Sequence, residues 1–250
     1  MMFRRLDPER IVQTASLLRR RIDERFPDAG LGRVAAELES VAREAAALSA
    51  WMARPHWPVR IAVFSAIALL LGGVVAAVTQ IQVPPGTSGI SDLLQGLEAL
   101  VNDIAFVGIA IYFLLGLEVR RKRARALDAL HVLRSLAHIV DMHQLTKDPE
   151  SLTPRRAATA SSPKREMTNF ELTRYLDYSS EMLAIVSKVA ALYVQQFNDP
   201  VTVNAASDVE ELSVGLSRAI WQKIAILDRV SLPEAAREAV EPVPAESANA

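Results

Sequence analysis

An uncharged apolar stretch over residues 61–78 constrains this chain more than any other feature. It holds about 18 residues without charge or proline, enough at 1.5 Å per helical residue to cross most of a hydrocarbon core about 30 Å thick. It begins far from the N-terminus, so a cleavable signal peptide is not predicted. We expect a first transmembrane helix over residues 59–83. The alternative is a buried helix in a large soluble core.

A second apolar stretch is predicted to cross the membrane over residues 97–119. Its first turns carry Glu98, Asn102 and Asp103, and the apolar run is then unbroken as far as residue 117. The connector between the two stretches, residues 84–96, is short, so the two helices would be antiparallel neighbours. The sequence therefore predicts an all-α protein with a two-helix membrane hairpin.

The residues that flank the two stretches predict their orientation. Basic residues crowd positions 120–125, directly after the second stretch, whereas the connector has neither Lys nor Arg. Cytoplasmic loops are enriched in Lys and Arg, so both termini are predicted to be cytoplasmic and the connector external. Tryptophans are typical of the membrane interface, and basic side chains attract anionic lipid. The predicted cytoplasmic interface consists of Trp51, Arg54, Trp57, Arg60, Arg120, Arg121, Lys122 and Arg123.

Asp103 has two interpretations, because ionisable groups inside a bilayer commonly mark an ion path. It lies 17 residues before Arg120 (120 − 103), which is about 25 Å along a helix. Asp103 can therefore reach the outer headgroup boundary without entering the apolar core. We favour this interfacial position over an ion site, because a carboxylate at the centre of a bilayer is costly.

Small residues recur at helical spacing on both stretches. They let helix backbones approach closely in a membrane, so close packing is predicted within the hairpin or between protomers. These residues are Ala68, Gly72 and Ala76 on the first stretch and Gly108 and Gly116 on the second.

Composition fits a membrane segment and excludes several chemistries. Half of the residues are hydrophobic but only 6% are aromatic, and the mean hydropathy is positive. The absence of cysteine excludes disulfides, thiolate zinc sites and thiol nucleophiles. A net charge of −1 gives no support for nucleic-acid binding. The bias toward Arg (23) over Lys (5) is typical of GC-rich bacterial genomes.

Helices are also predicted on both sides of the apolar stretches. Asp7 and Pro8 suit the start of a first helix, and a break at 27–30 gives a helical hairpin over residues 1–58. The segments that follow the second stretch are a basic amphipathic helix at 120–147, a flexible linker at 148–167, a helical pair at 168–230 and a disordered tail at 231–250.

The helical pair is predicted from two capping-box spacings. Thr168 and Glu171 are three residues apart and would open a helix that runs to about Phe197. Ser207 and Glu210 have the same spacing and would open the next helix.

Polar residues of the basic helix fall on one side of it at 100° per residue: His131, Arg134, His138 and Asp141. The two histidines are two turns apart, about 10.5 Å, too far to hold one metal ion. His138 and Asp141 could supply two ligands, but further ligands would have to come from another element. We therefore predict neither a metal site nor a cofactor.

A second polar row on the helix that begins near residue 168 includes Asp177 and Glu181. The favoured interpretation is that both rows face water while the apolar faces of the helices pack together. Apolar residues interrupt both rows, however, which is more typical of a contact surface. We therefore hypothesise that His131, Arg134 and His138 meet Asp177 or Glu181, within a subunit or across an oligomer.

The sequence resembles no family with a known motif, so function is predicted from organisation alone. We expect a two-span protein of a bacterial inner membrane that acts as a non-enzymatic scaffold, adaptor or regulatory subunit. Its expected partners are the lipid bilayer, anionic at the cytoplasmic face, and either another copy of the chain or another protein. The alternatives are a membrane-surface enzyme or ligand site that uses His131, His138 and Asp141, and an oligomeric channel or transporter subunit.

Overall fold

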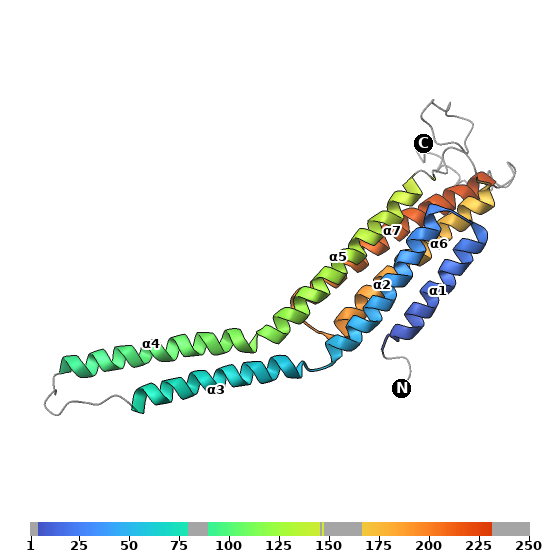
Figure 1. The fold of residues 1–250 in the computed structure, drawn as a ribbon. Coiled ribbons are helices and arrows are strands. Elements are labelled where there is room, and N and C mark those ends of the chain that lie inside the picture. Colours follow the sequence, from blue (N-terminus) through green and yellow to red (C-terminus); the bar gives the residue numbers. More distant parts are fainter. Residues whose placement is uncertain (1–4, 80–89, 146, 148–166, 232–250) are drawn as a thin grey trace, which may run out of the picture. The chain divides into compact units, whose positions relative to one another are not determined.

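The described part of the chain is all-helical. A computed structural model describes residues 5–79, 90–145, 147 and 167–231, and these ranges contain no strand (Figure 1). The predicted tail, almost all of the predicted linker and most of the predicted connector lie outside these residues. The helices are α1 (Pro8–Arg25), α2 (Gly30–Ala53), α3 (Trp57–Thr79), α4 (Ile90–Leu115), α5 (Leu117–Leu145), α6 (Asn169–Gln196) and α7 (Pro200–Ser231).

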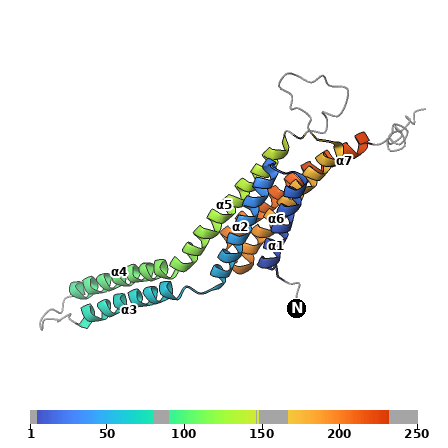
Figure 2. The ribbon, with the colours of Figure 1, turned by 45° about the vertical axis from the view of Figure 1, so that its right-hand side comes forward.

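The chain divides into two compact units, which we describe separately. One unit, here called the bundle, comprises Met1–Trp51 and Leu127–Ala250 and contains α1, α6, α7 and most of α2 and α5. The other unit, here called the hairpin, comprises Met52–Ala126 and contains α3 and α4. The antiparallel pairing of α3 with α4 can be followed in both ribbon views (Figures 1 and 2).

The predicted signals for the starts of α1 and α6 are confirmed. The Asp7 side chain accepts a hydrogen bond from the Glu9 amide at 3.0 Å, and Pro8 occupies the first turn of α1. Asp28, with φ of 64°, lies in the turn that separates α1 from α2. Thr168 and Glu171 form a reciprocal capping box at the start of α6.

The predicted start of the last helix is wrong. The sequence analysis placed it at Ser207, but α7 begins at Pro200. Asp199 is buried and accepts a hydrogen bond from the Thr202 amide at 3.2 Å, so it caps the helix eight residues earlier than Ser207 would. Proline suits a first helical position. The spacing of Ser207 and Glu210 falls inside α7 and begins no helix.

Helix α6 is the centre of the bundle, because α1 and α7 both pack against it. Phe26, at the end of α1, makes edge-to-face contacts with Tyr175 and Tyr178 of α6. Ile185 and Leu192, which interrupt the polar row of α6 in the sequence, are both buried. The row on α6 is therefore mixed: Ile185 and Leu192 belong to the core, whereas Arg174 and Lys188 are exposed.

Polar contacts join the other bundle helices. The carboxylate of Glu39 in α2 is 3% exposed and accepts hydrogen bonds from Arg19 of α1, at 3.1 Å, and from Arg43. At the end of α5, the Tyr175 hydroxyl donates to a backbone carbonyl at 3.3 Å. Lys223 of α7 donates to the Gln144 side chain at 3.0 Å. These bonds tie α1 to α2, and α5 to both α6 and α7.

Many of the large apolar side chains that the structure describes in α3 and α4 of the hairpin are exposed. Leu69 of α3 is 81% exposed and Phe106 of α4 is 72% exposed. Among the described residues one helical stretch, Gly30–Ala76, contains a window long and apolar enough to cross a membrane, and 6% of that window is buried. The apolar part of α4, Ile104–Leu115, is shorter.

The boundaries of α4 differ from those predicted. This helix begins at Ile90, inside the predicted connector, and ends at Leu115, and Gly116 separates it from α5. The predicted second span, residues 97–119, therefore covers parts of two helices. Glycine is destabilising inside a helix because it loses more backbone freedom on folding than other residues. Gly116 lies at the break between α4 and α5.

Tyr193 of α6 gives the bundle a predictable response to alkaline pH. Burial and the Glu44 carboxylate raise the pKa of Tyr193 to about 12, from an ordinary value of 10.0. The phenol therefore ionises in the unfolded chain before it ionises in the folded one. Its contribution to stability is fully present below pH 10 and is lost as the pH rises from about 10 to about 12.

We predict that Tyr193→Phe reduces this alkaline loss. Between pH 9 and pH 12 the variant should lose less free energy of unfolding than the wild type, by a difference on the order of 2 kcal/mol. Urea unfolding of the full chain in mild detergent, followed by circular dichroism, measures both losses. Equal losses in the two proteins would contradict the prediction.

Candidate functional site

The predicted polar residues of α5 lie on an exposed side of that helix. His131, Arg134 and His138 are exposed and make no side-chain hydrogen bond or ion pair with any described residue. Asp141 is half-buried and accepts a hydrogen bond from Gln144 in the next turn of the helix at 2.7 Å. These side chains form no catalytic arrangement with one another.

The two predicted carboxylates of α6 have other partners. Asp177 pairs with Arg174 of its own helix at 3.4 Å. Glu181 accepts two hydrogen bonds from Arg21 of α1, at 2.8 and 3.3 Å, and this Arg21 guanidinium also lies over the Tyr178 ring. The hydrogen bond to Glu181 and the charge of that carboxylate raise the pKa of Arg21 against the opposing effect of its burial. Contact between the α5 histidines and these carboxylates across an oligomer stays a prediction.

The described residues provide no arrangement of side chains that supports a metal site. In the ranges described, no group of three or more His, Asp and Glu side chains could hold a metal ion. His143 lies apart from the other two histidines of α5 and is close to Gly30 at the start of α2.

Several residues predicted for the membrane interface form a charged cluster where α3 and α5 begin, here called the base of the hairpin. The Glu118 side chain is 15% exposed and pairs with Arg60 at 2.8 Å and Lys122 at 3.0 Å. It also accepts a hydrogen bond from the His56 amide at 3.3 Å. Lys122 donates in turn to the Arg54 carbonyl at 3.0 Å. We call these five residues the Glu118 cluster.

The remaining interface residues are arranged around the ends of the helices. The Arg120 guanidinium lies over the ring of Phe113, at 4.6 Å from the ring centroid. Trp57 and Arg121 are exposed, whereas Trp51 and Arg123 are half-buried. The basic residues were predicted from the sequence but Glu118, the carboxylate that pairs with two of them, was missed. Its position four residues before Lys122 was the available signal.

The small residues of the two apolar stretches make few close contacts within the hairpin. Ala68 and Ala76 are exposed. A Cβ atom added to Gly72 or Gly108 would have no neighbour within 4 Å among the described atoms, whereas one added to Gly116 would lie 3.3 Å from the Arg120 guanidinium. Packing between protomers through these positions stays a prediction.

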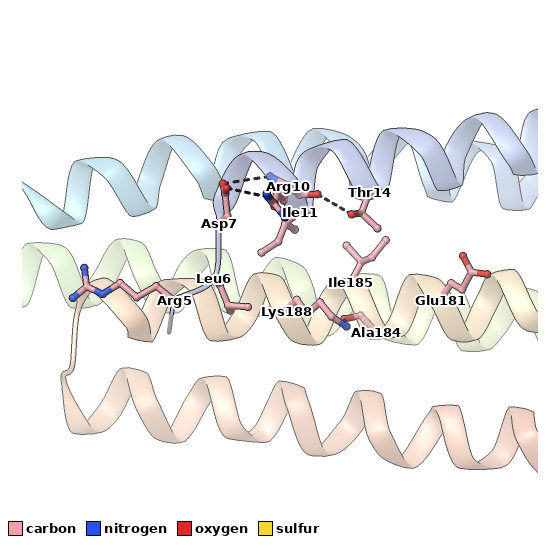
Figure 3. A pocket seen from close by; sticks show the side chains of 10 residues that line it. All are labelled: Arg5, Leu6, Asp7, Arg10, Ile11, Thr14, Glu181, Ala184, Ile185 and Lys188. Carbon is pink, nitrogen blue, oxygen red and sulfur yellow. Dashed lines mark hydrogen bonds and ion pairs between the residues drawn. The ribbon is translucent and has the colours of Figure 1, made fainter. Parts of the chain in front are cut away.

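A groove lies between α1 and α6 (Figure 3). Its volume is about 460 Å³, within the range of small-molecule sites. Leu6 and Ile11 line it from the α1 side, and Ala184 and Ile185 line it from α6. Figure 3 shows Ile185 standing between the two helices. We call this cavity the α1–α6 groove.

The segment before α1 is fixed to α6 beside this groove. The Gln195 side chain accepts a hydrogen bond from the Leu6 amide at 2.7 Å and donates one to the Leu6 carbonyl at 3.1 Å. The sequence analysis missed this pair and the Arg21–Glu181 pair, because each joins residues more than 150 positions apart.

Comparison with protein-family models, with curated proteins and with solved structures finds no match to this chain. Its function is therefore argued from its own residues.

We predict that Glu118→Ala loosens the base of the hairpin. The change removes the partner of two cations and of the His56 amide, and hydrogen bonds to charged groups contribute about 1.5–3 kcal/mol each. Amide hydrogen exchange in the peptide over residues 54–60 should become faster by about tenfold or more. Mass spectrometry of the full chain in lipid nanodiscs measures this rate.

The matched control for this change is Glu98→Ala, which removes an exposed carboxylate from the same hairpin. It should leave exchange in this peptide unchanged. Equal protection in wild type and Glu118→Ala would mean that the cluster does not hold α3 and α5 together.

Proposed function

We propose that this chain is a two-span protein of a bacterial inner membrane whose helical bundle acts on the cytoplasmic side as a scaffold or adaptor. The observation that carries the proposal is the exposed apolar surface of α3 and α4. Soluble monomers rarely expose contiguous apolar patches larger than a few hundred Å², so a surface of this kind needs a cover. A bilayer covers it on every side at once.

The length of α4 supports a second span although its apolar part is short. The helix has 26 residues, from Ile90 to Leu115, about 39 Å at 1.5 Å per residue. Its apolar part faces outward through Ile104, Phe106 and Tyr112, which are exposed. Glu98 and Asn102, in the third and fourth turns of the helix, are also exposed, which suits the part of a helix that passes the outer headgroup boundary.

The Glu118 cluster supports a cytoplasmic position for the base of the hairpin. Its single carboxylate neutralises part of the charge of Arg60 and Lys122. Arg120 and Arg121 remain exposed beside it. An excess of exposed arginines is typical of a cytoplasmic interface and attracts anionic lipid.

A scaffold or adaptor role is supported by apolar side chains on the outer faces of the bundle. Val132, Ile139 and Met142 of α5 are exposed and recur at the three- and seven-residue intervals of coiled-coil seams. Trp221 and Val214 of α7 are also exposed, seven residues apart. Tryptophan is enriched at the centres of protein interfaces. We propose that these faces bind a second copy or a protein partner.

Single cysteines test the sidedness of this arrangement, because the chain has none of its own. Thr87→Cys places a thiol in the predicted external connector, and Ser207→Cys places one on an exposed position of α7. A membrane-impermeant maleimide should label Thr87→Cys in intact spheroplasts. It should label Ser207→Cys only after the spheroplasts are lysed. Labelling of Ser207→Cys in intact cells, or release of the protein from membranes by carbonate, would contradict the proposal.

A single cysteine on α5 tests whether this helix forms the interface with a partner chain. Ser135 is exposed between Val132 and Ile139, so Ser135→Cys should form an intermolecular disulfide in oxidised membranes, whereas Ser207→Cys should not. A product at twice the chain mass of 27.4 kDa identifies a second copy, and a product of another mass identifies a different partner. If Ser135→Cys yields no cross-linked product, α5 is not the interface.

A further inference from the structure

The α1–α6 groove combines an apolar floor with charged side chains at its edges. Leu6, Ile11 and Ile185 provide the apolar floor. Five charged side chains, three of them cationic, also line the groove: Arg5, Asp7, Arg10, Glu181 and Lys188. An apolar pocket with a few polar groups at its edge is typical of small-molecule sites.

Both acidic side chains of the groove already have partners. Asp7 accepts from backbone amides at the start of α1 and pairs with Arg10 at 3.5 Å. Glu181 is held by Arg21 from outside the groove. The negative charges of the groove are therefore neutralised by neighbouring arginines.

Two cations of the groove, Lys188 and Arg5, have no carboxylate partner among the described residues. Lys188 is exposed and donates only to the Ala184 carbonyl of its own helix, at 3.1 Å. Arg5 is also exposed, and its side chain extends away from Lys188 beyond the end of the groove that precedes α1 (Figure 3). In the described part of the chain, no carboxylate pairs with either residue. The groove therefore has an excess of positive charge.

We propose that the α1–α6 groove binds a single-chain anionic amphiphile, such as a free fatty acid. The apolar body would lie on the Ile11 and Ile185 side chains, and the anionic head would pair with Lys188 and with Arg5 after the Arg5 side chain turns toward the groove. A cavity of about 460 Å³ has the size of a site for one small ligand. Charge complementarity selects an anionic head over a neutral one. This inference does not rest on the membrane proposal.

Photoaffinity labelling of the full chain in nanodiscs tests the site. The probe is a medium-chain fatty acid that carries an aliphatic diazirine, and its methyl ester is the matched neutral probe. After irradiation, peptide mass spectrometry should find the acid attached within residues 6–14 or 181–188, and the ester in these peptides to a much smaller extent. Both probes also enter the bilayer, so labelling of residues 61–78 provides an internal reference and reports on the membrane proposal separately.

Variants then test the residues of the groove. The double change Arg5→Gln and Lys188→Gln should lower labelling of the groove by the acid about fivefold, because exposed ion pairs contribute up to about 1 kcal/mol each. The matched control, Arg20→Gln with Arg218→Gln, removes two exposed arginines elsewhere on the bundle and should leave labelling unchanged. Ala184→Trp fills the groove without changing its charge and should abolish labelling of the groove by the acid.

Three results would overturn the proposal. The first is equal labelling of the groove by the acid and the ester, which would show that the cations do not select the ligand. The second is full labelling in the double variant. The third is an unlabelled groove that becomes labelled once residues 2–4 are deleted, which would identify the N-terminal residues of the chain as its occupant.

Discussion

The exposed apolar surface of α3 and α4 is the constraint on which the rest of this account depends. A helix in the core of a soluble protein buries its apolar residues against other helices, but Leu69 and Phe106 remain largely uncovered in the hairpin. At about 25 cal/mol per Å² of apolar surface, exposing such side chains to water is costly. On our proposal the lipid bilayer covers them.

The bundle is held together in a different way. Its centre is α6, whose buried residues meet α1 and α7, and its edges are joined by specific polar contacts such as Arg21–Glu181 and Glu39 with two arginines. Among the described residues, Lys188 and Arg5 of the α1–α6 groove have no acidic partner. Several apolar side chains of α5 and α7 are also exposed. The proposed ligand site and the proposed interaction faces therefore lie where described charged or apolar side chains lack a partner within the bundle.

Local signals in the sequence predicted much of the fold. Asp7, Thr168 and Glu171 act within a few residues of their own position, so their capping roles follow from spacing alone. The start of α7 was missed because Asp199 and Ser207 both suit a helix cap, and the burial of Asp199 favours the earlier one. The break at Gly116 was missed because hydropathy alone runs across it.

Contacts between distant parts of the chain could not be predicted. Residues on the polar side of α6 were expected to face water, yet α1 packs there, and Arg21 meets Glu181 across 160 positions. No periodicity within one helix specifies which helix will cover it. The pairing of Arg60 with Glu118 was missed for the same reason, since it depends on the start of α3 meeting the start of α5. On α5, His131, Arg134 and His138 are exposed, whereas Asp141 is half-buried.

The accessibility of nitroxide labels along the hairpin tests the central claim most directly. Single cysteines would replace Ile61, Leu69 and Phe106 in turn, with Ser207→Cys as the reference on α7, and each labelled chain would be reconstituted in vesicles. On our account, collisions with oxygen exceed those with a water-soluble nickel chelate most strongly at Leu69→Cys and Phe106→Cys, and the excess falls toward Ile61→Cys. Chelate collisions at Leu69→Cys and Phe106→Cys as frequent as at Ser207→Cys would place the hairpin in water and contradict the account.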